Sequence, residues 1–146
     1  EVAELYLTAT SADKAEVSRV ATALLRLGQL GAALGVHLVI AGQRFGSDLG
    51  PSATSLRAQL AGRVCFRVAD KGTAEMTLGD LDPGAVDAVQ AIPLSMPGVA
   101  VAYGAAGGGW MRARSHLVTP EQAQETARRF AHLTPAVGQL YAGGAA

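Results

Sequence analysis

Apolar residues recur every three to four positions over residues 13–33, which predicts an amphipathic helix. Ser11 or Asp13 would cap its start, and Gly35 would end it. The run that follows, Val36–Ala41, is short, β-branched and almost continuously apolar. That pattern is typical of a central strand buried on both faces of a parallel sheet.

The rest of the pattern predicts shorter elements and a hairpin. Helix and strand alternate at first and then give way to two strands around a glycine-rich turn, so the fold class is α/β. We expect helices over 52–60, 70–76, 82–91 and 119–133, a buried strand over 63–68, and hairpin strands over 98–103 and 110–115. The Gly/Ala-rich segment 134–146 is expected to be a flexible tail.

Length and composition indicate one folded domain. The chain has 146 residues, of which 49% are apolar and 16% charged, which excludes a disordered, low-complexity protein. Twelve basic residues balance twelve acidic ones, so no net field attracts nucleic acid or a membrane. All the basic residues except Lys14 and Lys71 are arginine, which suits bidentate binding of phosphate or carboxylate. A GC-rich genome would produce the same bias.

The single cysteine, Cys65, excludes an internal disulfide and any multi-cysteine zinc site. It lies in an apolar run, which favours a buried and unreactive thiol. The three histidines, His37, His116 and His132, show no metal-ligand spacing. No apolar stretch approaches the roughly 18 residues of a membrane-spanning helix, and no signal peptide is visible, so a soluble, cytoplasmic location is expected. Because the chain starts at Glu1 without Met, it is interpreted as a piece of a longer protein.

The glycine-rich run 104–109 is interpreted as a hairpin turn. It lacks the Lys-Ser/Thr pair of a phosphate-binding loop, and no helical pattern follows it. The pattern G-x-x-x-x-G-K-S/T occurs nowhere in the 146 residues. The sequence therefore contains no P-loop.

Polar residues follow directly after the predicted central strand. Gln43 and Arg44 would lie at its carboxyl end, where ligands bind in open α/β sheets. A carboxamide can orient an attacking water, and an arginine can neutralise a phosphate. An ordinary polar loop is the alternative interpretation. A third is an unrelated α/β enzyme with a loop site over 43–48, which would require an acid/base pair that Asp48 alone does not supply.

Several segments, in order along the chain, resemble the FtsK/SpoIIIE family of DNA translocases, with the TraB-like conjugative transfer proteins of actinobacteria as the nearest group. Residues 30–44, LGAALGVHLVIAGQR, resemble the family segment GRAxGIHLVLATQRP. Residues 56–68, LRAQLAGRVCFRV, resemble its helix and strand lRAnlpgRialRv. Further matches follow at 75–80 and 97–100, and residues 1–5 resemble the end of the Walker B motif DExADL. The resemblance covers about residues 1–130.

The resemblance implies the carboxyl-terminal half of a RecA-like P-loop NTPase domain: residues 1–133 would form a mainly parallel sheet flanked by helices, with a β-hairpin near the end. It implies ATP and Mg as cofactors, and a homo-oligomeric, hexameric ring that moves double-stranded DNA in conjugation or chromosome segregation. Glu1 would be the catalytic carboxylate that polarises water, and Gln43 would sense the γ-phosphate, with Arg44 beside it. Arg63 is a candidate for a nucleotide-binding or interface role, with a surface salt bridge as the alternative.

The chain departs from the family pattern in three places. Walker A is absent, and the Walker B strand with its magnesium-binding Asp would precede Glu1. Ala32 stands where the family has the arginine of GRA, a candidate for the finger that acts on a neighbouring subunit, and Phe45 replaces the proline of TQRP. The isolated chain is therefore not expected to hydrolyse ATP. A non-catalytic RecA-like assembly or DNA-binding module is the alternative, and a membrane anchor ahead of the motor is left open.

Overall fold

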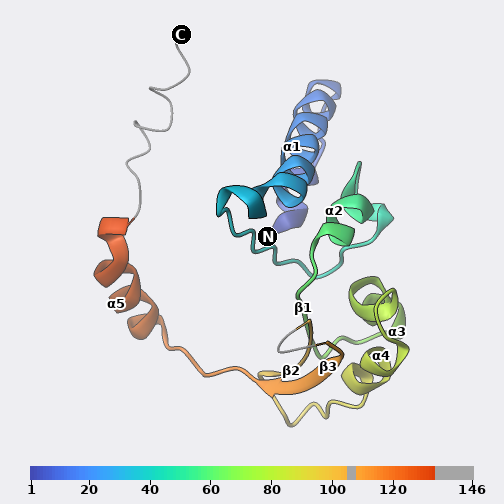
Figure 1. Cartoon of the computed structure of the whole chain (residues 1–146), viewed down its shortest axis with the longest axis vertical. Coiled ribbons are helices and arrows are strands. Elements are labelled where there is room, and N and C mark those ends of the chain that lie inside the picture. Colours follow the sequence, from blue (N-terminus) through green and yellow to red (C-terminus); the bar gives the residue numbers. More distant parts are fainter. Residues whose placement is uncertain (105–107, 134–146) are drawn as a thin grey trace. The chain divides into compact units, whose positions relative to one another are not determined.

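The computed structural model describes residues 1–104 and 108–133, and the expected tail 134–146 lies outside that range. The chain divides into two units, residues 1–115 and 116–146. The elements of the first unit (Figure 1) are α1 Ser11–Leu30, α2 Ala53–Gln59, β1 Arg63–Phe66, α3 Lys71–Ala74, α4 Pro83–Gln90, β2 Val99–Tyr103 and β3 Trp110–Arg114. The second unit contains α5, Pro120–Phe130.

Helix α1 confirms the first predicted helix and corrects its cap. The N-cap is Thr10, whose Oγ1 accepts a hydrogen bond from the Asp13 N–H at 3.3 Å, while Asp13 Oδ2 accepts one from the Thr10 N–H at 2.7 Å. Asp13 is thus the third residue of a capping box. Gly35 ends the 3₁₀ turn after α1 with φ at 71°, a left-handed conformation that costs glycine little.

Residues 36–41 form no strand among the described residues, so this element was predicted wrongly. The segment is irregular, and the side chain of Val39 is 92% exposed. Its link to the chain start is one backbone hydrogen bond, from the Val2 N–H to the Ala41 carbonyl at 2.9 Å. A doubly buried strand needs paired strands at both edges and helices on both faces, and the described residues place neither there. The mainly parallel sheet stays a prediction.

The sheet has the order β1-β2-β3, and both pairings are antiparallel. The two strands of the predicted hairpin are confirmed, while residues 105–107 of its predicted turn lie outside the described residues. In the register Val101 lies opposite Cys65 on one side and Arg112 on the other. Helices α3 and α4 lie on one side of this sheet (Figure 1), and Cys65 and Val101 pack into a core with their residues. The alternate residues of β1, Val64 and Phe66, are exposed. The predicted second buried strand is therefore shorter than expected and buried on one face.

The short helices begin where the sequence predicts. Asp70 caps α3, and its Oδ1 accepts a hydrogen bond from the Thr73 N–H at 2.8 Å. Asp82 caps α4, which has Pro83 in its first turn. Between them, residues Glu75–Gly79 form a π-helical turn, called the π-turn below, that the sequence pattern did not predict. Such turns are rare and often occur at functional sites.

In the second unit, α5 also begins as predicted. Thr119 Oγ1 accepts from the Gln122 N–H at 3.3 Å, and Gln122 Oε1 accepts from the Thr119 N–H at 2.9 Å. This reciprocal pair is a second capping box. Within residues 1–104 and 108–133, no helix combines the length and apolarity needed to cross a membrane.

The core of the first unit predicts a large difference between two leucines. Leu78 in the π-turn is fully buried against α4, whereas Leu94 is 81% exposed. Leu78→Ala should lower the free energy of unfolding by about 2–5 kcal/mol, because it removes apolar contacts and leaves a cavity. Leu94→Ala is the matched control and should change it by less than about 0.5 kcal/mol. Urea unfolding measures both, and equal losses would contradict the described core.

Candidate functional site

The structure brings together the first residue of the chain and the end of the segment 36–41. Glu1 Oε1 accepts a hydrogen bond from the Gln43 backbone N–H at 3.2 Å, across 42 positions of sequence. Both residues are exposed. The Glu1 carboxylate thus lies next to the backbone of Gln43 at a position that water can reach. A carboxylate in such a position can orient a water molecule.

Arg44 lies beside them with one weak ionic partner. Its Nη2 atom is 3.7 Å from Asp48 Oδ2 and 3.8 Å from Met76 Sδ. Both charged side chains of the pair are more than half exposed. Exposed ion pairs contribute about 0–1 kcal/mol, so a phosphate could displace Asp48 at little cost. Arg44 can therefore bind an anion such as a phosphate.

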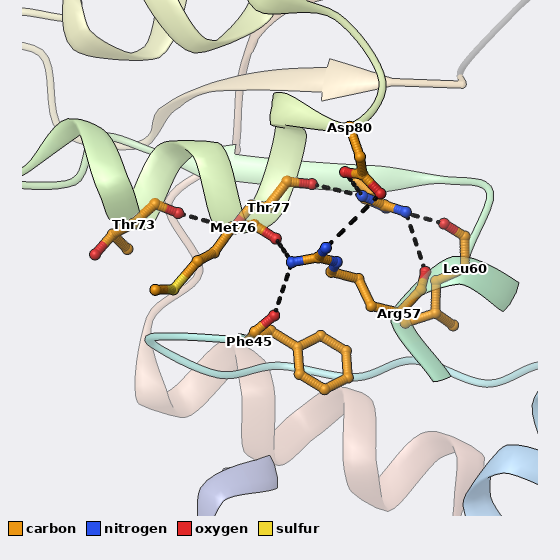
Figure 2. A network of polar contacts seen from close by, with 8 residues as sticks. Phe45, Arg57, Leu60, Thr73, Met76, Thr77 and Asp80 are labelled. Carbon is orange, nitrogen blue, oxygen red and sulfur yellow. Dashed lines mark hydrogen bonds and ion pairs between the residues drawn. The ribbon is translucent and has the colours of Figure 1, made fainter. Parts of the chain in front are cut away.

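Arg63 occupies a buried position away from Glu1 and Gln43. Its side chain is 7% exposed, and it is paired with Asp80 at 2.5 Å. All three guanidinium nitrogens also donate to backbone carbonyls (Figure 2), which belong to Leu60, Thr77 and Arg57. The pair is therefore half-buried, since Arg63 is buried and Asp80 is 41% exposed, rather than the surface salt bridge considered above, and it joins β1 to the residue just after the π-turn. A nucleotide-binding or interface role for Arg63 stays a prediction.

Arg57 is the residue of this region that the sequence analysis missed. From α2, its Nη1 donates to the Phe45 carbonyl at 3.2 Å and to the Met76 carbonyl at 2.5 Å (Figure 2). Its Nη2 lies 3.9 Å from Asp80 Oδ2. These partners are 12 to 23 positions away in sequence, so helical spacing gives no sign of them. The only sequence signal was an arginine on a short, otherwise uncharged helix.

Asp80 carries the negative charge between the two arginines. Burial alone would raise the pKa of this carboxyl group. The hydrogen bond from Arg63 and the charges of Arg63 and Arg57 outweigh burial, and together they hold the pKa of Asp80 below its ordinary value of 3.8. The carboxylate is therefore ionised at neutral pH. Its role is to pair with the two arginines in the folded structure and not to transfer protons.

A hollow of about 290 Å³ separates this network from the irregular segment 36–41. Residues from four segments line it: Leu38, Val39, Ile40, Phe45, Arg57, Leu60, Gly62, Arg63, Val64 and Thr77. Most of these side chains are apolar, so the hollow suits packing of apolar groups rather than binding of an ion.

Ala32 is exposed on the 3₁₀ turn after α1. Over the described ranges, no three His, Cys, Asp or Glu side chains group as a metal site would require.

Comparison with known proteins gives two relatives from Streptomyces. The chain is 51% identical over 135 residues to the "Sporulation regulatory protein" of Streptomyces azureus, which aligns with 92% of this chain and 44% of that protein. It is 49% identical over 142 residues to the "Transfer protein TraSA" of Streptomyces ambofaciens, with 97% and 34% covered. The chain thus spans less than half of either relative. No family model and no solved structure matches it.

These relatives bear on the resemblance seen in the sequence. Their names concern transfer and sporulation, and the alignments extend over nearly all of this chain. The chain is therefore similar, over nearly its whole length, to part of one Streptomyces protein named for transfer and part of another named for sporulation.

The Asp80 cluster predicts how stability depends on pH. Because the pKa of Asp80 is lower in the folded than in the unfolded state, its pairing stabilises the fold above about pH 4. That contribution is lost as the pH falls through the folded pKa. Asp80→Asn should lower the free energy of unfolding at pH 7 by about 1–3 kcal/mol, less than a fully buried pair because Asp80 is 41% exposed. Urea titrations at pH 7 and pH 2.5 check this: the difference between the two proteins should be smaller at pH 2.5, and an undiminished difference would contradict the prediction.

Cys65 should be protected from thiol reagents. Its side chain is buried between β1 and α4, and burial raises the pKa of the thiol, with a hydrogen bond to Thr77 acting weakly the other way. The thiolate is the reactive form, so its reaction at pH 8 should be at least about 100-fold slower in the folded chain than in urea. Absorbance after addition of a disulfide reagent measures the rate. Equal rates in the folded chain and in urea would contradict the described burial of Cys65.

Proposed function

We propose that this chain is the carboxyl-terminal part of a RecA-like motor of the FtsK/SpoIIIE type, one that moves double-stranded DNA during conjugation or chromosome segregation. The observation that carries the proposal is the hydrogen bond between Glu1 and Gln43. The resemblance assigns these two residues to one ATP site, and nothing in their sequence separation requires them to meet. The similarity to a Streptomyces protein named for transfer supports the same function.

Phosphoryl transfer depends on positioning and charge stabilisation, and the three residues can supply both. One oxygen of Glu1 is held by the Gln43 N–H, which leaves the other oxygen to orient a water for attack. The Gln43 carboxamide can contact a γ-phosphate, and Arg44 can exchange Asp48 for a phosphate oxygen.

The residues of this chain fit only part of an ATP and Mg site. The sequence has no P-loop, and the described residues hold no cluster of metal ligands. In the proposed motor, the triphosphate and Mg are bound by residues that precede Glu1, and the metal neutralises charge on the phosphates. Contact with DNA is through phosphates, because a motor must pass every sequence. Each ATP site lies between subunits of a hexameric ring.

A second candidate is a non-catalytic assembly or DNA-binding module with the same fold. The observation in its favour is Ala32, which replaces the candidate arginine finger and lies exposed. An arginine finger contributes about 10³–10⁵ in rate, so its loss would leave a very slow ATPase. The two candidates therefore differ in measurable turnover.

The test is ATP hydrolysis by the longest natural reading frame that contains this chain, with and without double-stranded DNA. We expect DNA-stimulated turnover, and Glu1→Gln should lower kcat by about 10²–10⁴ with ATP binding kept, because the water loses its orienting carboxylate. Glu16→Gln, at an exposed glutamate of α1 outside the segments that resemble the family, is the matched control and should keep full activity.

The same assay separates the two candidates. An increase of kcat in Ala32→Arg would support a motor with a weakened finger at this position. Absence of ATP binding and turnover in both the natural protein and Ala32→Arg would refute the motor and leave the non-catalytic module.

A further inference from the structure

The loop 43–48, which carries Gln43 and Arg44, contacts the rest of its unit through Glu1, Met76 and the guanidinium group of Arg57. We infer that Arg57 is a positioning residue: it fixes the loop against the π-turn and thereby sets where Gln43 and Arg44 present their side chains. This inference rests on the proposed function, since it names a further residue for the same site.

The contacts of Arg57 connect three segments. Its Nη1 atom donates to the Phe45 carbonyl of the loop at 3.2 Å and to the Met76 carbonyl of the π-turn at 2.5 Å. Its own carbonyl accepts from Arg63 Nη2 at 3.1 Å. The Phe45 carbonyl belongs to the Phe45–Gly46 peptide, one residue after Arg44. Its direction therefore constrains the backbone from which the Arg44 side chain leaves.

Met76 gives the loop a second contact with the same turn. Its Sδ atom lies 3.8 Å from Arg44 Nη2, while its carbonyl accepts from Arg57. A Cβ atom added at Gly46 would lie 3.0 Å from the same sulfur and 2.5 Å from Asp48 Oδ1, so the loop backbone packs closely on Met76. The loop thus packs against the π-turn at Arg44 and Gly46, and Arg57 links the Phe45 carbonyl to the same turn.

The π-turn supplies acceptors because it ends a helical segment. Carbonyls in the last turn of a helix lack partners within the helix, and cations are favourable near that end. Here the carbonyls of Met76 and Thr77 accept from Arg57 and Arg63, respectively. The two arginines therefore cap the same turn, and Asp80 just after it pairs with both. Of these two arginines, Arg57 is the one that also holds the loop.

A lysine at position 57 would keep the charge but not this geometry. The planar guanidinium places two nitrogens at fixed positions, one toward two carbonyls and one toward Asp80. A single ammonium on a flexible stem can hold the Met76 carbonyl or Asp80, but it does not fix the Phe45 carbonyl at the same time. Arg57→Lys should therefore release the loop while the core of β1, α4 and the π-turn stays intact.

The first readout uses this chain alone. Chymotrypsin cleavage after Phe45 reports how often the loop leaves the π-turn, and the substitution does not change the specificity of that protease. We expect Arg57→Lys to speed this cleavage at least 10-fold, with the urea midpoint close to that of the natural chain. Arg67→Lys, at an exposed arginine just past β1, is the matched control and should leave the rate unchanged.

The second readout is ATP hydrolysis by the longer protein. Misplacement of reacting groups by about 1 Å can cost 100-fold in rate, so Arg57→Lys should lower kcat about 10- to 100-fold with KM changed less than 2-fold. A purely structural role would lower kcat only in proportion to the unfolded fraction. If Arg57→Lys does not fold, Asp80→Asn releases the guanidinium from one side and should change both readouts in the same direction, by more than its measured unfolded fraction accounts for.

The outcomes separate this inference from the proposed function. Turnover by the natural protein with unchanged kcat in the folded Arg57→Lys variant would overturn the positioning role and leave the motor standing. An unchanged cleavage rate after Phe45 would also overturn it. Failure of the natural protein to hydrolyse ATP would overturn the proposed function, and the positioning role with it.

Discussion

One buried arginine, one partly buried arginine and one aspartate set the constraint on which the first unit depends. A guanidinium taken out of water needs acceptors in its own plane, and Arg63 finds them in three carbonyls and Asp80. These acceptors lie in α2 or directly after it, and in the π-turn or directly after it. The hydrogen bonds of the single Arg63 side chain therefore fix how these segments pack against β1 (Figure 2). Arg57 uses the same carboxylate and adds the loop 43–48.

This arrangement places a polar, exposed site next to a rigid, buried support. Glu1, Gln43 and Arg44 are exposed and have few partners. In the supporting network every guanidinium nitrogen of Arg63 is hydrogen-bonded, whereas the Nε of Arg57 is buried without a partner among the described residues. Catalytic groups work best on such supports, because water and phosphate then bind to atoms that need not be reorganised. On the proposed function, the apolar segment 36–41 is where the remaining strands of a parallel sheet would pair, and the relatives are more than twice as long as this chain.

Local signals predicted most elements correctly, and a long-range requirement explains the main error. Thr119 and Asp82 begin their helices as the pattern indicates, because caps and an N1 proline act within one turn. The hairpin strands follow from an apolar run over 99–103 and a mixed run over 110–114 on either side of a glycine-rich segment. Residues 36–41 carry an equally clear strand pattern, yet a strand exists only when another strand pairs with it, and the described residues provide none.

By itself, the sequence determined the starts of α3, α4 and α5, the two hairpin strands, the buried thiol of Cys65 and the candidates Glu1, Gln43 and Arg44, since each depends on nearby residues or on a recognisable segment. Only the tertiary structure decided the roles of the arginines. Arg57 and Arg63 both precede apolar or small residues in similar surroundings, and nothing local distinguishes a solvated arginine from a buried one. Their partners at Phe45, Thr77 and Asp80 come from other segments, because a guanidinium is satisfied by whichever carbonyls and carboxylates the folded chain places around it.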